Sequence, residues 1–266
     1  MSSSPAEVAA QYATERHLRT RIETHERYSV GPGLEGTVDR LLALTGDEAV
    51  LDVGTGPGDF PGRLRAEGHQ GRIVGLDFSA GMVERASGEY PDVEFQQGDA
   101  AALPFADASF DVVTARHMLY HVPDVAAALA EFRRVLKPGG RFLAVTNAEG
   151  YMAELWAVVV EAGQAEPAVN ALLDSKAGSA VFSETQGERL VRAAFGNVQL
   201  DFIENALVFT TPEPVLAYLE SMPALQNLAP DTLERARAAL TQAVMARIQG
   251  GEWRVSKRVV FISARR

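Results

Sequence analysis

The chain has 266 residues, 47% of them hydrophobic and 23% charged, a composition that excludes a largely disordered protein. It contains no cysteine, which excludes disulfides, thiolate metal sites and a cysteine nucleophile. Its 25 Lys and Arg residues stand against 35 Asp and Glu, and the resulting net charge of −10 disfavours binding to nucleic acid.

No segment approaches the roughly 18 consecutive apolar residues of a membrane span. The first residues also lack the basic patch and the apolar block of a secretory signal. We therefore expect a cytoplasmic protein that does not associate with a membrane. No pattern in the sequence fixes its oligomeric state.

Residues 1–46 are expected to form an N-terminal helical cap. Residues 5–30 have helical character, and their interleaved Arg and Glu side chains suit a solvated helix. A Gly-Pro-Gly break at 31–33 separates them from a short amphipathic helix over about 38–44.

The pattern changes at residue 49, where short runs rich in Val, Ile and Leu begin to alternate with helical stretches. This alternation is typical of parallel strands joined by crossover helices. The clearest helix, over 125–136, should end at the Pro-Gly-Gly of 138–140. The prediction is an α/β fold with a doubly wound, mostly parallel sheet over residues 47–149, its strands at about 49–53, 72–76, 92–96, 110–114 and 141–146.

Beyond residue 149, helical stretches alternate with two further strand patterns. A helical insertion is expected over 150–196, and residues 197–266 should complete the sheet with strands at 198–209 and 259–262. A second helical insertion, at about 212–252, separates these strands. Because both insertions follow ends of the sheet, we expect them to form a lid that shapes substrate choice.

The strongest local signal is VLDVGTGPGDF at residues 50–60. A hydrophobic strand runs into Gly54, Gly56 and Gly58, so the backbone can turn tightly and a ligand can approach it with no Cβ in the way. In a dinucleotide-binding G-x-G-x-x-G loop the third glycine would stand where this chain has Asp59. Its charge would repel a pyrophosphate, which disfavours NAD.

Two aspartates follow the next two predicted strands. Asp77 lies at a suitable distance beyond the glycine loop to accept hydrogen bonds from both hydroxyls of a ribose. Asp99 can accept a hydrogen bond from an exocyclic amine such as that of adenine. Together with the loop, these acids indicate a ligand that contains a nucleoside.

The segment 50–148 resembles the core of class I methyltransferases that depend on S-adenosyl-L-methionine (SAM), especially the small-molecule branch with the ubiquinone- and menaquinone-pathway enzymes. The resemblance rests, in order, on VLDVGTGPGDF, GLDFSAGMVERA, GDAAALPFADASFDVV, the YHV-P-D element at 120–124 and RRVLKPGGRF. It implies a Rossmann-like methyltransferase fold with N-terminal helices and helical lid insertions. It also implies SAM as cofactor, S-adenosyl-L-homocysteine (SAH) as its product, and a small-molecule acceptor.

The resemblance further implies roles for individual residues. Asp77 would bind the ribose, and Arg116 would lie near the methionine carboxylate. The methionine part would be flanked by Asp52, Gly54, Thr55, Gly56 and Gly58. The adenine would be contacted by Phe78 or Met82 on its face and by Asp99 and the Ala100 backbone at its edge.

Methyl transfer mainly requires an acceptor oxygen or nitrogen aligned with the S–CH₃ bond and shielded from water. His117 and His121, after the fourth strand, are candidate catalytic bases near the methyl group. Residues that would line the substrate or lid come from the N-terminal segment: Tyr12, His25 and Tyr28. The remaining histidines, His17 and His69, are interpreted as surface residues.

No metal is expected, because residues 114–117 place no acid at the end of the fourth strand, where catechol methyltransferases ligate Mg²⁺. The Asn or Asp followed by Pro-Pro of DNA and RNA amino-methylating enzymes is absent there too.

Two other classes of function stay open. The chain could be an rRNA methyltransferase that contacts RNA through its arginine-bearing N-terminal helix and the basic residues Lys257, Arg258, Arg265 and Arg266. It could also bind SAM without transferring a methyl group.

Overall fold

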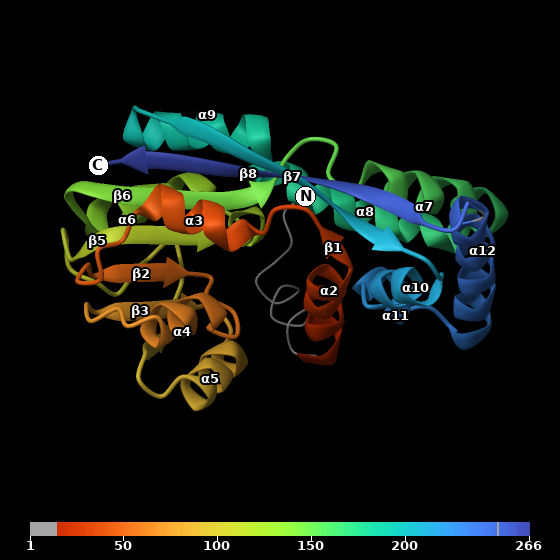
Figure 1. Ribbon diagram of the computed structural model, residues 1–266, viewed down its shortest axis with the longest axis horizontal. Helices are drawn as coiled ribbons and strands as arrows, with labels where there is room; N and C mark the ends of the chain where they lie inside the picture. The colour runs from red at the N-terminus through yellow and green to blue at the C-terminus, as the bar shows by residue number, and fades with distance from the viewer. Residues whose placement is uncertain (1–14, 249) are drawn as a thin grey trace.

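The computed structural model describes residues 15–248 and 250–266, which build one eight-stranded sheet flanked by helices (Figure 1). The strands are β1 Ser29–Val30, β2 Val50–Val53, β3 Ile73–Asp77, β4 Glu94–Gln97, β5 Phe110–Arg116, β6 Leu136–Asn147, β7 Gln199–Phe209 and β8 Trp253–Arg265. The helices are α2 Glu15–Tyr28, α3 Leu34–Leu42, α4 Asp59–Ala66, α5 Ala80–Glu89, α6 Val125–Val135, α7 Ala153–Ala165, α8 Ala171–Gly178, α9 Glu184–Phe195, α10 Glu213–Glu220, α11 Pro223–Gln226 and α12 Pro230–Ile248. Three short 3₁₀ helices are η1 Leu119–His121, η2 Pro167–Asn170 and η3 Ser179–Phe182.

The sheet has the strand order β1-β7-β8-β6-β5-β2-β3-β4. Strands β2 to β6 pair in parallel, whereas β8 pairs antiparallel with both β6 and β7, and β1 pairs antiparallel with β7. The chain moves outward from β2 through β3 to β4 and then returns to β5, so the order reverses between β2 and β5. Ligands of such sheets bind outside the carboxyl ends of the strands at this reversal. The predicted doubly wound, mostly parallel sheet is confirmed.

Alternation along the central strands fills both faces of the sheet. Val50, Ile73 and Val112 pack against α3 and α4 on one face. Leu51 and Val113 point to the other face, where α6 and α9 cover them. The central strands are mostly apolar because both of their faces are buried.

A further hydrophobic core lies at the far end of β7 and β8 from the strand bundle (Figure 1). There Phe209 and Trp253 pack with buried residues of α7, α10 and α12. Helices α7 and α8 of the segment expected at 150–196 therefore share one core with the helices of 212–252, whereas α9 packs on the sheet. In the described part of the chain, no helix combines the length and the apolar character needed to cross a membrane.

Three local predictions were wrong. Ser29–Val30 forms the short strand β1 on β7, although the sequence pattern continues the preceding helix through it. Strand β8 begins at Trp253, six residues before its predicted start. Strand β6 begins at Leu136, so the Pro-Gly-Gly of 138–140 lies within it, beside a shift of register against β5.

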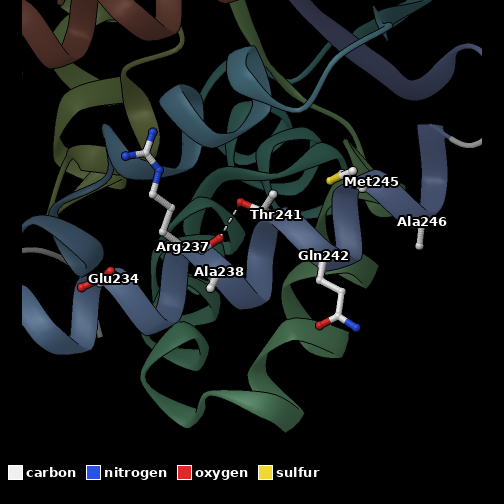
Figure 2. Close-up of a pocket in the computed structure, with 7 residues that line it drawn as sticks. All are labelled: Glu234, Arg237, Ala238, Thr241, Gln242, Met245 and Ala246. Carbon is white, nitrogen blue, oxygen red and sulfur yellow. Dashed lines mark hydrogen bonds between the residues drawn. The ribbon is translucent and has the colours of Figure 1, made fainter.

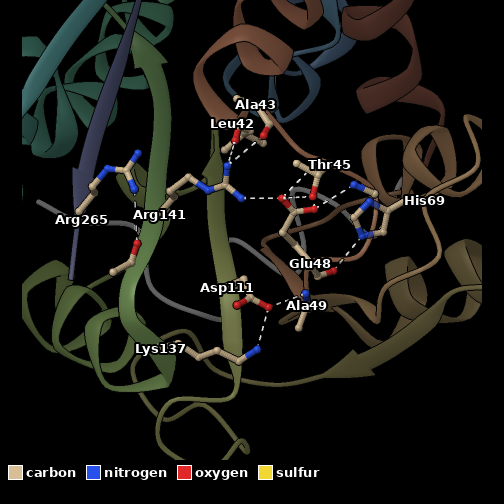
Figure 3. A network of polar contacts seen from close by, with 12 residues as sticks. Leu42, Ala43, Thr45, Glu48, Ala49, His69, Asp111, Lys137, Arg141 and Arg265 are labelled. Carbon is tan, nitrogen blue, oxygen red and sulfur yellow. Dashed lines mark hydrogen bonds and ion pairs between the residues drawn. The ribbon is translucent and has the colours of Figure 1, made fainter.

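The prediction that His69 lies at the surface was also wrong, because its side chain is buried (5% exposed). Its ring Nε2 lies 2.8 Å from the carbonyl oxygen of Glu48. Figure 3 shows the network around it, in which Arg141 of β6 donates to the Glu48 carboxylate at 2.8 Å and to the carbonyl of Leu42 at the end of α3. The network ties α3 and the turn before β2 to the amino-terminal edge of the sheet, opposite the edge where a ligand would bind.

Candidate active site

The glycine turn after β2 has the geometry that its sequence predicts. Gly54, Gly56 and Gly58 all have positive φ, at +70°, +57° and +87°. A Cβ on Gly54 would lie 2.5 Å from Met118 Cβ, whereas a Cβ on Gly56 would meet no atom within 4 Å. The turn is therefore closed against the protein at Gly54 and open at Gly56, where a ligand can approach the backbone.

Asp77, at the end of β3, is joined directly to this turn. Its Oδ2 accepts from the Gly56 N–H at 2.8 Å, and its Oδ1 accepts from the Ser79 N–H at 2.9 Å. Burial raises the pKa of this carboxyl, and the backbone N–H groups oppose that rise. Each oxygen keeps a second lone pair that can accept a ligand hydroxyl.

Asp52 is buried beneath the same turn (3% exposed) and accepts from the Thr114 hydroxyl at 2.6 Å. Burial raises its pKa, and the charge of Arg116 opposes the rise. The Arg116 guanidinium donates to Glu35 of α3 at 2.9 Å and stacks 4.3 Å from the ring centre of Phe60. Arg116 thus lies near Asp52 but is held by an ion pair with α3.

The residues expected around an adenine lie on neighbouring strand ends. The Phe78 ring is 44% exposed, whereas Met82 in the first turn of α5 is buried. Asp77 pairs with Gln97 across β3 and β4, and the Gly98 N–H donates to the Asp77 carbonyl at 2.9 Å, so the backbone just before Asp99 is bonded to the end of β3. Asp99 is exposed and accepts from the Ala101 N–H. Ala100, next to it, is buried.

His117 and His121 follow β5 at the carboxyl edge of the sheet. His117 has φ +53°, in the left-handed region that few non-glycine residues adopt. Burial, helped by the charges of Arg116 and Lys257, lowers the pKa of His117 to about 4. Burial and Arg21 lower the pKa of His121 to about 4 as well. Both rings are therefore neutral near pH 7.

Helix α2 brings residues of the N-terminal segment to the same edge. The His25 ring makes an edge contact with Tyr218 of α10, and its pKa falls to about 3 through burial and through Lys257, His117 and Arg21. The Tyr28 ring packs 5.3 Å from Phe209 and belongs to the border of the core around α7, α10 and α12. Tyr12 lies outside the described residues.

Sequence reasoning missed Lys257, which was grouped with a basic chain end. It is buried (7% exposed), and its charge acts on the rings of His25 and His117. Strand β8 alternates, so that 253, 255, 257 and 259 face inward together, and a polar residue in that series was the available signal.

Neither metal-ligating side chains nor the hollow on α12 provide a second ligand site in the part of the chain that the structure describes. Within residues 15–248 and 250–266, no three His, Asp or Glu side chains gather closely enough to hold a metal ion. Figure 2 shows a hollow on the outer side of α12, lined by residues of that helix alone, among them Met245. It carries no convergent polar groups from other elements.

Comparison with known proteins places the site in a family. Residues 51–144 match the family described as a methyltransferase domain. Demethylmenaquinone methyltransferase of Lactococcus lactis is 43% identical over 115 residues, which are 41% of this chain and 45% of the relative. The ubiquinone/menaquinone biosynthesis C-methyltransferase of Desulfotalea psychrophila is 40% identical over 106 residues, 38% of this chain and 43% of the relative.

The fold extends beyond that shared segment. The phosphoethanolamine N-methyltransferase 2 of Haemonchus contortus, solved with S-adenosylhomocysteine, covers 95% of this chain with a TM-score of 0.57 at 17% identity, over 57% of its own length. The chain spans less than half the length of the curated relatives named above. The strand order and the glycine turn joined to Asp77 agree with this match, and residues 51–144 are accordingly identified as a methyltransferase domain.

Proposed function

We propose that the protein transfers the methyl group of SAM to a small-molecule acceptor. The observation that carries this proposal is the bond from the Gly56 N–H to Asp77, because it places a carboxylate beside an open, side-chain-free turn at the reversal point of the sheet. SAM, when bound there, supplies an electrophilic methyl group on a sulfonium.

The residues at the site fit this group. Asp77 would accept from the ribose hydroxyls, and Gly54 to Gly58 would leave room for the methionine part. SAM has no phosphate that the turn would have to bind. The acids Asp52 and Asp77 suit a ligand that carries an ammonium and a sulfonium.

The acceptor atom is proposed to be oxygen or nitrogen, with His117 or His121 as a base. Their rings are neutral at pH 7, so each has a lone pair that can take a proton. Carbon is the second candidate, because one relative is named a C-methyltransferase. The relatives' quinone substrates make an aromatic acceptor of similar size a reasonable first class to test. We propose a cytoplasmic location, which fractionation of the native host would check.

An RNA acceptor is the weaker alternative. Arg258 pairs with Glu184 at 2.8 Å and stacks on Phe202, and Arg266 donates to the Arg134 carbonyl at 2.8 Å. These basic residues are engaged within the chain, and Lys257 is buried. A steep fall of RNA binding with salt would favour this alternative.

Calorimetry with SAH tests the cofactor site. Wild type should bind SAH with Kd at or below about 1 mM, and Asp77→Ala should weaken binding at least ~10-fold, the loss expected for a hydrogen-bonded charge. Asp92→Ala, an exposed aspartate in the loop before β4, is the matched control and should bind like wild type. Unchanged binding in Asp77→Ala would remove the site assignment.

The transfer itself is tested with SAM carrying a ¹³C methyl group. Incubation with 1,4-naphthoquinone in its reduced form, 1-naphthylamine and 2-hydroxy-1,4-naphthoquinone offers carbon, nitrogen and oxygen nucleophiles. The ¹³C shift of the product methyl identifies which atom received it. SAH binding without transfer to any of these or to a small-molecule extract of the native host would support a SAM-binding protein that is not an enzyme.

A further inference from the structure

Lys257 occupies an unusual position for a lysine. It lies on β8 beyond the last β6 pairing, Asn147 with Val259, and therefore just outside the carboxyl edge of the parallel strands. Its side chain points inward with Val255 and Val259 and is only 7% exposed. Lysine is seldom buried to this extent unless it is paired.

The contacts of Lys257 leave its charge uncompensated. Its Nζ donates to the Ser29 hydroxyl at 2.7 Å, and that hydroxyl in turn donates to the carbonyl of His25. An ammonium has three donors, and among the described residues no carboxylate lies within ion-pair distance of this one. Burial accordingly lowers the pKa of Lys257 to about 8, which still leaves it mostly protonated at pH 7.

The charge of Lys257 acts on the rings of His25 in α2 and His117 after β5, and Arg21 and Arg116 act on these two rings as well. The Nδ1 atom of His25 is buried without a hydrogen-bond partner among the described residues. A buried nitrogen without a hydrogen-bond partner, beside a buried ammonium with one side-chain partner and no counter-charge, points to a ligand that supplies both.

From this juxtaposition we propose that Lys257 and His25 form the anion-recognition end of the acceptor site, with Ser29 holding the ammonium in place, so that the methyl acceptor carries an acidic oxygen: a carboxylate or an ionised phenolic or enolic hydroxyl. The inference rests on the proposed function, since it assumes that His117 marks the place of methyl transfer. The lysine would orient the acceptor and balance its negative charge. Its role is positioning and specificity, and no bond to it is formed or broken.

Two probes of nearly equal shape separate charge from size. 2-Hydroxy-1,4-naphthoquinone is an anion at neutral pH, and 1,4-naphthoquinone is neutral. Calorimetry on the full chain saturated with SAH should show the anion binding at least ~10-fold more tightly, as charge-assisted hydrogen bonds are the stronger ones. In Lys257→Met this preference should fall below about twofold, whereas Lys257→Arg should keep most of it. Arg254→Met, an exposed cation on the opposite face of β8, is the control and should keep it fully.

The outcomes distinguish the two proposals. Absence of SAH binding to wild type would overturn the proposed function. SAH binding with equal affinity for the two quinones, or with none for either, would overturn the role of Lys257 alone. A direct readout does not depend on the folding of Lys257→Met: the chain has three lysines, so ε-¹³C-lysine labelling gives a simple spectrum that Lys257→Arg assigns. The hydroxyquinone should shift the Lys257 resonance, and an unmoved resonance would overturn the proposal.

Discussion

At the scale of single residues, substitution of two glycines can distinguish the effect of backbone strain from the effect of ligand contact. Gly56 and Gly68 both have positive φ, and a Cβ on either would meet no protein atom within 4 Å. Replacing either by valine should cost about 1–2 kcal/mol in the free energy of unfolding, because each must hold a left-handed conformation. Only Gly56→Val should also weaken SAH binding, by at least ~10-fold, as calorimetry would measure. Equal loss of binding in Gly68→Val would show that strain alone explains the effect.

A second residue-level prediction concerns His25 and pH. Its pKa is about 3 in the folded state against 6.5 in a free histidine, so the unfolded chain binds a proton that the folded chain does not between these values. Stability is therefore complete above pH 6.5 and falls as the pH drops toward 3, by up to about 1.4 kcal/mol per pH unit for this group. Urea unfolding at pH 7, 6 and 5 should show a smaller loss in His25→Gln than in wild type. Identical pH dependence in the two proteins would contradict the buried, neutral ring.

The position of a residue in the fold could be predicted from the sequence where the residues next to it along the chain form a recognisable strand, turn or helix. Asp77 follows an apolar strand and precedes a helix, so its place at the carboxyl edge was predicted together with the glycine turn. Lys257 stands between Ser256 and Arg258 and looks like part of a solvated basic end. Its burial depends on β8 extending past β6 to meet α2 and β1, which are more than 200 residues away in sequence. His69 was misread for the same reason, because its partner is a backbone carbonyl of another segment.

At the scale of elements, the turn before β2 depends on Glu48 (Figure 3). Burial favours the neutral carboxyl, yet the N–H groups of Thr45 and Gly46 and the charge of Arg141 hold its pKa at about 2. Glu48→Gln removes the charge from these donors and should lower the free energy of unfolding at pH 7 by about 2–3 kcal/mol. Because the folded pKa is depressed, the wild-type advantage should persist above pH 4.5 and vanish as the pH falls toward 2.

Urea unfolding of both proteins checks this prediction, with Asp47→Asn as the control. Asp47 is the exposed neighbour of Glu48, and its replacement should change stability at pH 7 by less than about 0.5 kcal/mol. Equal losses in the two variants would indicate a general charge effect and not the hydrogen bonds of the network.

The elements that the sequence predicted well are those with one strong periodic signal. Helix α6 and strands β2, β3 and β5 lie within a few residues of their predicted places, since each is an apolar run bounded by glycine or polar residues. The ends of β8 were missed because its inward series includes Lys257 and its outward series includes Arg254 and Ser256, which together resemble a loop. The two-residue strand β1 exists only through its pairing with β7, a tertiary contact that local propensity cannot supply.

At the scale of the whole molecule, β7 and β8 run through two cores. The half of β8 that begins at Val259 pairs with β6 and completes the sheet together with its partner residues in β7. The other half of both strands, with Leu207 and Val255, belongs to the core around α7, α10 and α12. Because this core shares two continuous strands with the sheet, it cannot unfold without disrupting the sheet. We therefore expect the molecule to unfold as one cooperative unit.

The two tryptophans of the chain make this expectation measurable. Trp156 and Trp253 both belong to the core around α7, α10 and α12, which is separate from the cores that contain β2, so tryptophan fluorescence reports on that core alone. Fluorescence and far-UV circular dichroism should give coincident urea transitions. SAH at about 100 times its Kd should stabilise both by roughly 2.7 kcal/mol, because a ligand of the folded state stabilises everything that unfolds with its site. Asp77→Ala should abolish this stabilisation by SAH. A fluorescence transition whose urea midpoint SAH does not change would show that the core around α7, α10 and α12 folds independently of the cofactor site.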